Sequence, residues 1–551
     1  MKLAALTVLI ICCFAASGSL AEPFLQPLTR ADCAHARMVW SESANVCLAE
    51  SEVPSAQPLT RRACIAAGMS WDENANVCGI VEAENRSIQH PNATDSDASS
   101  ASSQSSRQQV GDEPLPPPSY PTVAEVRAKL ADASLSKDAA PNDLAALRAF
   151  YGELTGPPLW ITTSGFSAKA QAIIREIEQA DDWGLPAELL DHPTAGAAPS
   201  TTDSQAIEEV RLSLAILRYA RYARGGRLSL RRVNTLFYQK PPVIDPKTII
   251  SEIALTIDPT SYLRELHPKH GEFKRLRQAL LDLRAKPTDN EALIQRLIVN
   301  MERWRLMPAE FGSTYVWNNI PELKARIVKQ GKTIYEERII VGKPKTPTPI
   351  FSASMQSIVF HPEWLLPKSV VEEEQNAAGG EMTAEFLKRR NLKVRLKGTP
   401  VDLESVDWGA ATLNQYTFVQ PAGPGNALGK LKFNFPNRHA VYMHDTSQPE
   451  LFNETNGALS HGCIRLREPE RLAKLLLAED KGWSEQRVSE ILKSGKTKWV
   501  KLTRPVPVHL TYFTVRVSDD GELATFADIY GLDERMGSAL WGRPSKLDLT
   551  P

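Results

Sequence analysis

The sequence has little cysteine and no surplus of either charge. Only 7 of its 551 residues are cysteine, and 64 basic side chains stand against 65 acidic ones, which gives a formal net charge of −1. This balance creates no overall attraction to nucleic acid or to an anionic membrane, so a charged ligand must be met by a local patch. The composition, with 42% hydrophobic and 23% charged residues, is that of a globular protein and excludes collagen-like and coiled-coil chains. At roughly 150 residues per domain, the length predicts about three to four folding units.

Long apolar runs are also missing after the N-terminus, which excludes a multi-span membrane protein. The exception is the apolar stretch 3–16, which follows Lys2 and precedes small residues that end at Ala21. This order is typical of a secretory signal peptide, residues 1–21. An uncleaved N-terminal membrane anchor is the alternative. Whether the stretch is a cleaved signal peptide or an uncleaved anchor, we expect an exported protein whose mature part is soluble or tethered only at its N-terminus.

Four of the cysteines lie in an internal repeat with a period of 31 residues, within residues 22–82. Pro-Leu-Thr-Arg, Cys, Trp and Asn-Val-Cys recur at the same spacing in both copies. Units this small bury too little core to stand alone, and exported proteins meet an oxidising compartment, so we predict disulfides rather than the alternative four-cysteine metal site. Of the three possible pairings we favour the one that closes loops of about 15 residues, each worth about 3 kcal/mol. The predicted disulfides are Cys33–Cys47 and Cys64–Cys78.

Composition and periodicity divide the rest of the chain. Residues 83–121 are rich in Ser and Pro, which predicts a disordered linker. Helical periodicity dominates residues 122–287. After Trp304 the period changes to two, as in the hairpin predicted around Gln330-Gly331, so we expect a mostly β region with a few helices. Further strands are predicted at 355–360, 393–397, 439–443, 506–517 and 522–530.

Two short stretches carry reactive side chains. The first is Arg438–Thr446, in which strand alternation would place Tyr442 and His444 on one face. The second is Ser460–Leu466, which contains Cys463, the cysteine left without a disulfide partner. A thiol is only a few per cent ionised at neutral pH, so a cysteine nucleophile needs a positive or basic neighbour. His444 is the candidate.

The backbone around these residues suits the same chemistry. Gly462 lets the chain come close to a substrate carbonyl and turn amide N–H groups towards a developing oxyanion. The carbonyl of Asp445 can accept the Nδ1–H of His444, which leaves Nε2 free to act as a base. The two stretches therefore predict a cysteine nucleophile served by a histidine.

At these residues the sequence resembles a known family. His444, fifteen further residues and then Ser460-His461-Gly462-Cys463 are similar to the signature of the YkuD-type L,D-transpeptidases. The resemblance extends over about 125–535, to the helical scaffold region and the catalytic domain of the large periplasmic branch. Other segments that carry it are Phe150-Tyr151, Pro158-Leu159-Trp160, Asp182-Trp183-Gly184-Leu185, Asn300–Trp304, Asn319-Ile320-Pro321, Thr348–Phe351, Phe360–Trp364, Gly425–Gly429 and Phe433–Pro436. The Cys repeats lie outside it, and no peptidoglycan-binding module is evident.

The resemblance implies a cysteine acyl transfer on the bacterial cell wall. Cys463 would attack the carbonyl of the third, diamino acid residue of a tetrapeptide stem, release the terminal D-alanine and pass the acyl group to a neighbouring stem as a 3→3 cross-link. His444 would move the protons and the backbone at Asp445 would orient it. Five further residues are expected to meet the oxyanion or the substrate, Arg465 through a substrate carboxylate: Tyr442, Ser460, His461, Gly462 and Arg465.

The resemblance also sets expectations about location and partners. It implies a periplasmic enzyme of cell wall biogenesis and cell shape that carbapenems inactivate. The expected partners are peptidoglycan stem peptides, with an outer-membrane lipoprotein as a further candidate acceptor and no nucleic acid, and the oligomeric state is open. We expect no cofactor and no metal. Zinc is the alternative by residue type, disfavoured because strand alternation would separate His439 from His444.

The predicted fold class is a multidomain α+β chain in which small disulfide repeats and a flexible linker precede an α-helical scaffold domain and a mostly β YkuD-like catalytic domain. Hydrolysis and D-amino acid exchange stay open as variants of the reaction, and a non-catalytic periplasmic wall-binding scaffold is the alternative function. The predicted ranges are the signal peptide 1–21, the Cys repeats 22–82, the linker 83–121, the scaffold domain 122–287, the catalytic domain 288–535 with a lid insertion at about 366–410, and a C-terminal tail 536–551.

Overall fold

The computed structural model describes residues 39–41, 46–48, 70–72, 77–79, 121–132, 139–196, 201–286, 290–377, 382–409 and 411–542. The predicted signal peptide and nearly all of the predicted linker lie outside these residues, as do the side chains of Cys33, Cys47, Cys64 and Cys78, so the predicted disulfides are not tested. Among the described residues, no helix combines the length and the apolar character that crossing a bilayer requires.

The two Cys repeats each contain a two-stranded sheet. In the first copy β1 (Val39–Ser41) pairs antiparallel with β2 (Val46–Leu48). In the second copy β3 (Ser70–Asp72) pairs with β4 (Val77–Gly79). Both strands thus recur at the same spacing as the sequence repeat. Most of this region belongs to one compact unit of the chain, and residues 89–551 belong to another.

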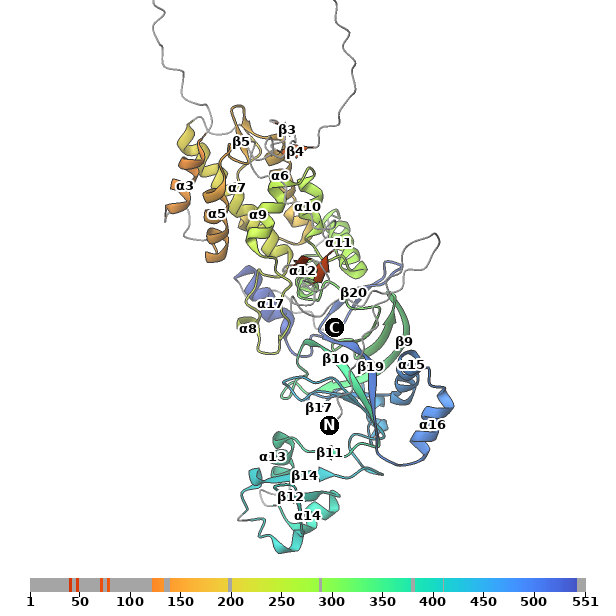
Figure 1. Cartoon of the computed structure of the whole chain (residues 1–551). Coiled ribbons are helices and arrows are strands. Elements are labelled where there is room, and N and C mark those ends of the chain that lie inside the picture. The colour runs from red at the N-terminus through yellow and green to blue at the C-terminus, as the bar shows by residue number, and fades with distance from the viewer. Residues whose placement is uncertain are drawn as a thin grey trace, which may run out of the picture. The chain divides into compact units, whose positions relative to one another are not determined.

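The helical region of the second unit is held together by its own apolar core (Figure 1). Its longest helix carries a buried face that includes Val210, Leu217 and Tyr219. Thr201 caps the start of this helix, because its side chain accepts from the Ser204 backbone amide. The elements are α3 (Val123–Ala131), α5 (Pro141–Glu153), β5 (Ile161–Thr162), β6 (Gly165–Phe166), α6 (Ala168–Glu178), η1 (Ala180–Trp183), η2 (Ala187–Leu190), α7 (Thr202–Ala223), α9 (Pro246–Leu255) and α10 (Pro259–Glu265).

Two parts of the predicted scaffold range 122–287 pack on the β region instead. Residues 228–238, which include α8 (Leu230–Val233), bury Leu230 and Phe237 in the core of the nine-stranded sheet of the β region. We call these residues the strap. The helix α11 (Gly271–Arg284) shares a third apolar cluster with α12 (Glu291–Arg305) and β20 (Val515–Val517). The helical and β regions are therefore joined by packed side chains as well as by the chain itself.

The β region is built on a nine-stranded sheet in the order β17-β9-β18-β16-β15-β10-β19-β7-β8. Because β9 also pairs with β8, the pairings close into a ring. The strands are β7 (Thr314–Asn319), β8 (Lys324–Lys329), β9 (Lys332–Gly342), β10 (Phe351–Phe360), β15 (Leu431–Asn434), β16 (Met443–His444), β17 (Ala458–Ser460), β18 (Ile464–Leu466) and β19 (Lys498–Thr511). The remaining elements are η5 (Pro449–Asn453), α15 (Pro469–Lys481), α16 (Glu485–Lys493), β21 (Leu523–Thr525) and α17 (Leu532–Trp541).

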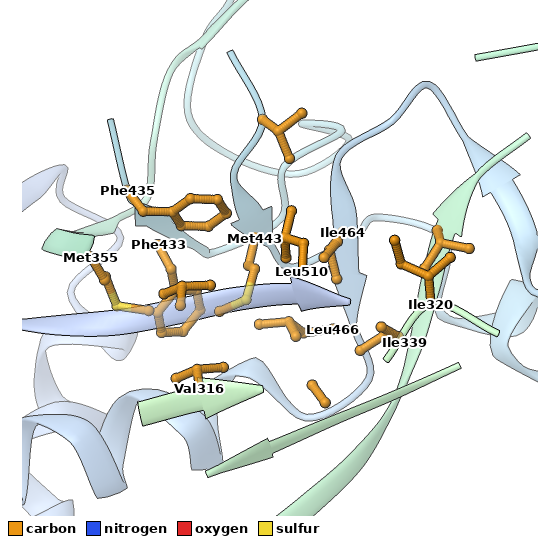
Figure 2. Packing of buried hydrophobic residues seen from close by; sticks show 14 of the residues in the cluster. Val316, Ile320, Ile339, Met355, Phe433, Phe435, Met443, Ile464, Leu466 and Leu510 are labelled. Carbon is orange, nitrogen blue, oxygen red and sulfur yellow. The ribbon is translucent and has the colours of Figure 1, made fainter. Parts of the chain in front are cut away.

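The core of this sheet is formed by apolar side chains from strands that are far apart in the sequence. Phe433 on β15 pairs in register with Met443 on β16, and Met443 with Ile464 on β18. Figure 2 shows these side chains among others of the same cluster. All three are fully buried. Since strand side chains alternate, the residues next to them on each strand must face the other side of the sheet.

Several local predictions can be compared with these elements. The hairpin around Gln330-Gly331 is confirmed, and both turn residues have the positive φ of a type I′ turn, 48° and 76°. The predicted strand 506–517 is divided between β19 and β20. The predicted strand 439–443 is wrong over residues 439–442 and is borne out only at Met443, where β16 begins. Asn437 binds the backbone of His439 and Val441 and holds a turn before this strand.

The predicted tail 536–551 is also wrong over its first residues. Residues 536–541 belong to α17, and Met536 and Leu540 are buried in the core of the sheet. The sequence signal was weak there, because α17 is short and is stabilised by packing rather than by a strong helical pattern.

An insertion between β10 and β15 forms a lobe with its own sheet, in the order β11-β14-β12-β13, and its own apolar cluster around Val394, Trp408 and Phe418. The predicted lid, 366–410, falls within this lobe. Figure 1 shows its elements gathered together. They are β11 (Trp364–Leu365), α13 (Lys368–Ala377), α14 (Ala384–Arg389), β12 (Lys393–Leu396), β13 (Thr399–Val401), η3 (Leu403–Ser405), η4 (Leu413–Gln415) and β14 (Tyr416–Gln420).

Candidate active site

A row of three polar residues crosses the sheet next to the buried row of Phe433, Met443 and Ile464. Lys432 on β15 lies opposite His444 on β16, and His444 lies opposite Arg465 on β18. Strand alternation turns this polar row away from the apolar core. The sheet therefore places an imidazole between two cationic side chains on one face.

Cys463 and Tyr442 lie beside this row. Each directly precedes a residue of the buried row, and the Ile464 amide donates to the Tyr442 carbonyl at 3.1 Å. Tyr442 and His444 share the same side, with ring centroids 5.6 Å apart. The Cys463 thiol lies 3.9 Å from the Ala440 carbonyl oxygen, to which it donates, and it also hydrogen-bonds to Tyr442. The structure thus brings together the residues that the two reactive stretches supplied.

The pKa of the Cys463 thiol depends on burial and on two neighbouring cations. Removal of water raises the pKa of the Cys463 thiol, whereas Tyr442, Lys432 and Arg465 act in the opposite direction. The resting thiol is therefore protonated. Once it loses its proton, the nearby positive charges of Lys432 and Arg465 stabilise the thiolate.

His444 is buried, and its Nδ1 is 2.5 Å from the Asp445 carbonyl oxygen, the contact expected from the sequence. Burial, with Arg465 and Lys432 as neighbouring cations, lowers the pKa of His444 to about 3. The imidazole is thus neutral, with Nδ1–H donating and Nε2 left as the basic nitrogen. Within the described site no hydrogen bond joins His444 to the sulfur, and the two residues share Tyr442, Lys432 and Arg465 as neighbours.

Lys432 is the site residue that sequence reasoning missed. Its Nζ lies 3.9 Å from the centroid of the Tyr442 ring, and burial lowers the pKa of its amine while the Cys463 charge acts against this. It lies within the segment Gly429–Pro436, close to residues that carried the family resemblance. That position alone did not reveal its role, because only the pairing of β15 with β16 sets Lys432 opposite His444.

The loop before Cys463 is held by hydrogen bonds between its own polar groups. Ser460 Oγ donates to the Cys463 carbonyl at 2.5 Å and accepts the Gly462 amide at 3.1 Å. Gly462 has a φ of 109°, which only glycine adopts without strain, and its carbonyl accepts from Thr348 Oγ1 at 2.9 Å. The Gly462 amide was expected to face an oxyanion and instead binds Ser460. The Cys463 amide has no acceptor among the described residues and is the one left for that purpose.

The remaining predicted residues lie at the edges of the site. His461 Nε2 contacts the carboxylate of Glu373 on α13 of the insertion lobe, and Lys343 lies 3.7 Å from the same carboxylate. Arg465 reaches Gln448 at 3.5 Å, while its Nε is buried without a partner in the described structure. His461 therefore contacts the lobe, and Arg465 has a buried Nε donor without an acceptor in the described structure.

Asp445 orders the backbone around the histidine. Its carboxylate accepts the amides of Lys430 and Thr446, each at 2.7 Å, and its carbonyl holds His444. Burial raises the pKa of this carboxyl, and the two backbone amides oppose the effect. The position predicted to orient the imidazole is thus itself held at three points.

The described residues contain no group of three or more His, Cys, Asp or Glu side chains placed to hold a metal ion. His439, part of the zinc alternative, lies with its ring centroid 3.9 Å from that of Tyr238 and 5.3 Å from that of Phe351. It therefore packs among aromatic rings.

Two family models match separate parts of the chain. Residues 145–280 match a family model described as a scaffold domain, and residues 313–500 match one described as an L,D-transpeptidase catalytic domain. A curated protein of Haemophilus influenzae, described as an inferred L,D-transpeptidase, is 34% identical over 258 residues, which cover 46% of this chain and 51% of that protein. The chain thus matches about half the length of this relative.

Two solved structures are similar at lower identity. An L,D-transpeptidase from Mycobacterium smegmatis is 13% identical, with 36% of this chain and 58% of that chain covered and a TM-score of 0.18. L,D-transpeptidase 3 from Mycobacterium tuberculosis, in complex with a faropenem-derived adduct, is 13% identical, with 36% and 60% covered and a TM-score of 0.17. At such TM-scores neither similarity supports a conclusion about this chain.

Proposed function

The chain carries a YkuD-type L,D-transpeptidase catalytic domain behind a scaffold domain, and from this premise we propose that it is a peptidoglycan L,D-transpeptidase that works through a thioester on Cys463. The observation that carries the proposal is the row Lys432, His444 and Arg465, which lies beside Cys463 on the polar face of the catalytic sheet. A nucleophile, a neutral base and two counter-charges are the parts that cysteine acyl transfer requires.

In the first half of the reaction the sulfur attacks the carbonyl of the third residue of a tetrapeptide stem. A bond forms between sulfur and carbon, and the thiol proton passes to Nε2 of His444, which Asp445 keeps available. The Cys463 amide faces the oxygen on which negative charge develops. The C–N bond then breaks, and the imidazolium returns its proton to the nitrogen of the departing D-alanine, which leaves a thioester.

In the second half an amine on a neighbouring stem attacks the thioester. The amine loses its proton to His444, the C–S bond breaks, and the sulfur takes up the proton to restore the thiol. The product is a 3→3 cross-link. Lys432 and Arg465 act in both halves, because sulfur carries negative charge when it attacks and when it leaves. Water, a free D-amino acid or a lipoprotein amine would complete the same half-reaction.

The test is incubation of the purified protein with disaccharide tetrapeptide, followed by mass spectrometry of the products. We expect a dimer that has lost one D-alanine. Carbapenem treatment is expected to give a stoichiometric adduct on Cys463. Both signals should vanish in Cys463→Ala, with unchanged thermal unfolding as the control for folding. A folded wild-type protein that gives neither product nor adduct would instead support a non-catalytic wall-binding protein.

We further propose a periplasmic location, supported by the signal-like stretch at residues 1–21. Expression of the full chain in a Gram-negative host, with fractionation and N-terminal sequencing, tests this. We expect a periplasmic protein that begins at Glu22. Recovery of an unprocessed chain from the cytoplasm would contradict the proposal.

A further inference from the structure

The strap, residues 228–238, brings side chains of the helical region to the edge of the active site. Its backbone is tied to the catalytic sheet by two hydrogen bonds of 2.9 Å, from the Ile350 amide to Leu236 and from the Tyr238 amide to Ile350. Phe237 is buried in the core of the catalytic sheet. The strap, which contains α8 in Figure 1, is therefore held in position by backbone hydrogen bonds and by the burial of Phe237.

A cationic and aromatic cluster forms where the strap meets the turn before β16. The Tyr238 ring lies against His439, and two guanidinium groups lie over it, Arg231 at 5.1 Å and Arg438 at 4.9 Å from the ring centroid. Both arginines are exposed. Burial, together with Arg438 and Arg231, lowers the pKa of His439, so this ring adds no charge of its own. The two cations thus share one aromatic platform.

The cluster has no negative charge to balance it. Neither Arg231 nor Arg438 forms an ion pair with a carboxylate in the described part of the chain. Cation–π contacts orient guanidinium groups but leave their N–H donors unused. Two like charges around one ring repel each other, and an anion between them would remove that repulsion and accept from both.

The cluster is close to the reacting sulfur. His439 directly precedes Ala440, whose carbonyl accepts from the Cys463 thiol at 3.9 Å. An extended peptide spans about 3.3–3.6 Å per residue, so a tetrapeptide stem that is attacked at Cys463 is long enough to reach the cluster. In the described structure Arg465, which is predicted to meet a substrate carboxylate, contacts Gln448 and no residue of this cluster.

We propose that Arg231, Tyr238 and Arg438 form a subsite that binds a carboxylate of the peptide stem, distinct from the one expected at Arg465. The inference rests on the proposed function, and it gives the helical region a direct part in substrate binding. Arg231 comes from the strap and Arg438 from the turn before β16, so the subsite is complete only when the strap is seated against that turn.

Binding is measured by calorimetry on the full chain carrying Cys463→Ser, which needs no turnover. The ligands are a stem tetrapeptide with all its carboxylates and a panel in which each carboxylate in turn is a carboxamide. We expect Arg231→Gln and Arg438→Gln each to weaken binding of the full stem about five- to tenfold, as the loss of a partly exposed charged contact would do. One member of the panel should bind the parent and both variants equally.

The matched control is Arg232→Gln, which removes the neighbouring exposed charge of α8 and leaves the Tyr238 ring contacts intact. It should bind the stem as the parent does. Thermal unfolding of each variant checks that the strap stays seated. Arg231→Lys keeps the charge without the planar donors and should fall between the parent and Arg231→Gln.

The outcomes separate this inference from the proposed function. If every variant binds every stem as the parent does, or if the loss persists for all carboxamides, the subsite is refuted. Turnover and the carbapenem adduct are scored in parallel on the Cys463 chain. If both turnover and the adduct are absent, the proposed enzymatic function is refuted. The calorimetric binding data still show whether the carboxylate subsite exists.

Discussion

Two ionisable side chains, Glu209 in the helical region and Arg465 in the nine-stranded sheet, differ in how the hydrogen bonds of their buried atoms are satisfied. In the helical region Glu209 is fully buried, and its two oxygens accept from the Tyr151 hydroxyl and from the amides of Leu159, Trp160 and Ile161, at 2.6–3.1 Å. In the catalytic sheet the Arg465 Nε is buried without a partner among the described residues. A buried polar group with all its hydrogen bonds made stabilises the structure around it, whereas a buried donor without an acceptor lowers the stability of its surroundings.

Loss of the Glu209 carboxylate should have the largest effect on stability. In Glu209→Gln an amide NH₂ would face backbone donors that now meet oxygen, so we expect a loss of about 3 kcal/mol in the free energy of unfolding. Urea unfolding followed by circular dichroism measures it. The matched change Glu208→Gln, on a partly buried neighbour in the same helix, should cost less than about 1 kcal/mol. Equal effects would show that the buried hydrogen bonds are not what stabilises this region.

In the candidate active site, substitution of Lys432 tests whether its positive charge stabilises the Cys463 thiolate. In Lys432→Met the thiolate loses one counter-charge, so the pKa of the Cys463 thiol should rise and its alkylation at neutral pH should slow about tenfold. The pH profile of alkylation by iodoacetamide measures both quantities. Lys432→Arg should restore much of the rate. Lys430→Met, an exposed lysine nearby, serves as the control, and a Lys432→Met profile that matches it would contradict the assigned role.

The lowered pKa of His444 should make the free energy of unfolding depend on pH. Its pKa is lowered to about 3 in the folded chain, compared with an ordinary value of about 6.5 once unfolded. Between these values only the unfolded chain binds the proton, so stability falls as the pH falls from about 6.5 towards 3. His444→Asn should make this fall shallower by roughly 1 kcal/mol per pH unit. Urea unfolding of both proteins at about pH 4.5 and pH 7 measures it, and parallel curves would refute the assignment.

The contact between the insertion lobe and the catalytic loop should have the smallest effect. Glu373 is about half exposed and pairs with His461 and Lys343, so Glu373→Gln should cost less than about 1 kcal/mol. We expect faster amide hydrogen exchange in the lobe, residues 364–420, and little change elsewhere. Glu372→Gln, the exposed neighbour, is the control. Unchanged exchange in Glu373→Gln would show that the pair does not hold the lobe.

Much of the site could be predicted because its signals are local. The turn at Gln330-Gly331 follows from residue type, as does the bend at Gly462, and His444 and Cys463 are reactive residues at a recognisable spacing. The hydrogen bond from the Gly462 amide to Ser460 Oγ could not be predicted from the sequence, because it depends on how the loop folds back on itself. The same holds for residues 439–443, where the side chain of Asn437 replaces a strand with a turn.

The sequence by itself determined which groups can react and how the chain turns locally, since both depend on side-chain chemistry and on backbone preferences within a few residues. The tertiary structure alone decided that Lys432 lies opposite His444, that Arg465 lies beyond it, and that the strap carries Arg231 to the edge of the site. These contacts depend on strand register and on the seating of the strap. Register is chosen by the burial of the whole apolar core, of which Phe433, Met443 and Ile464 are part, and no single stretch of sequence contains that information.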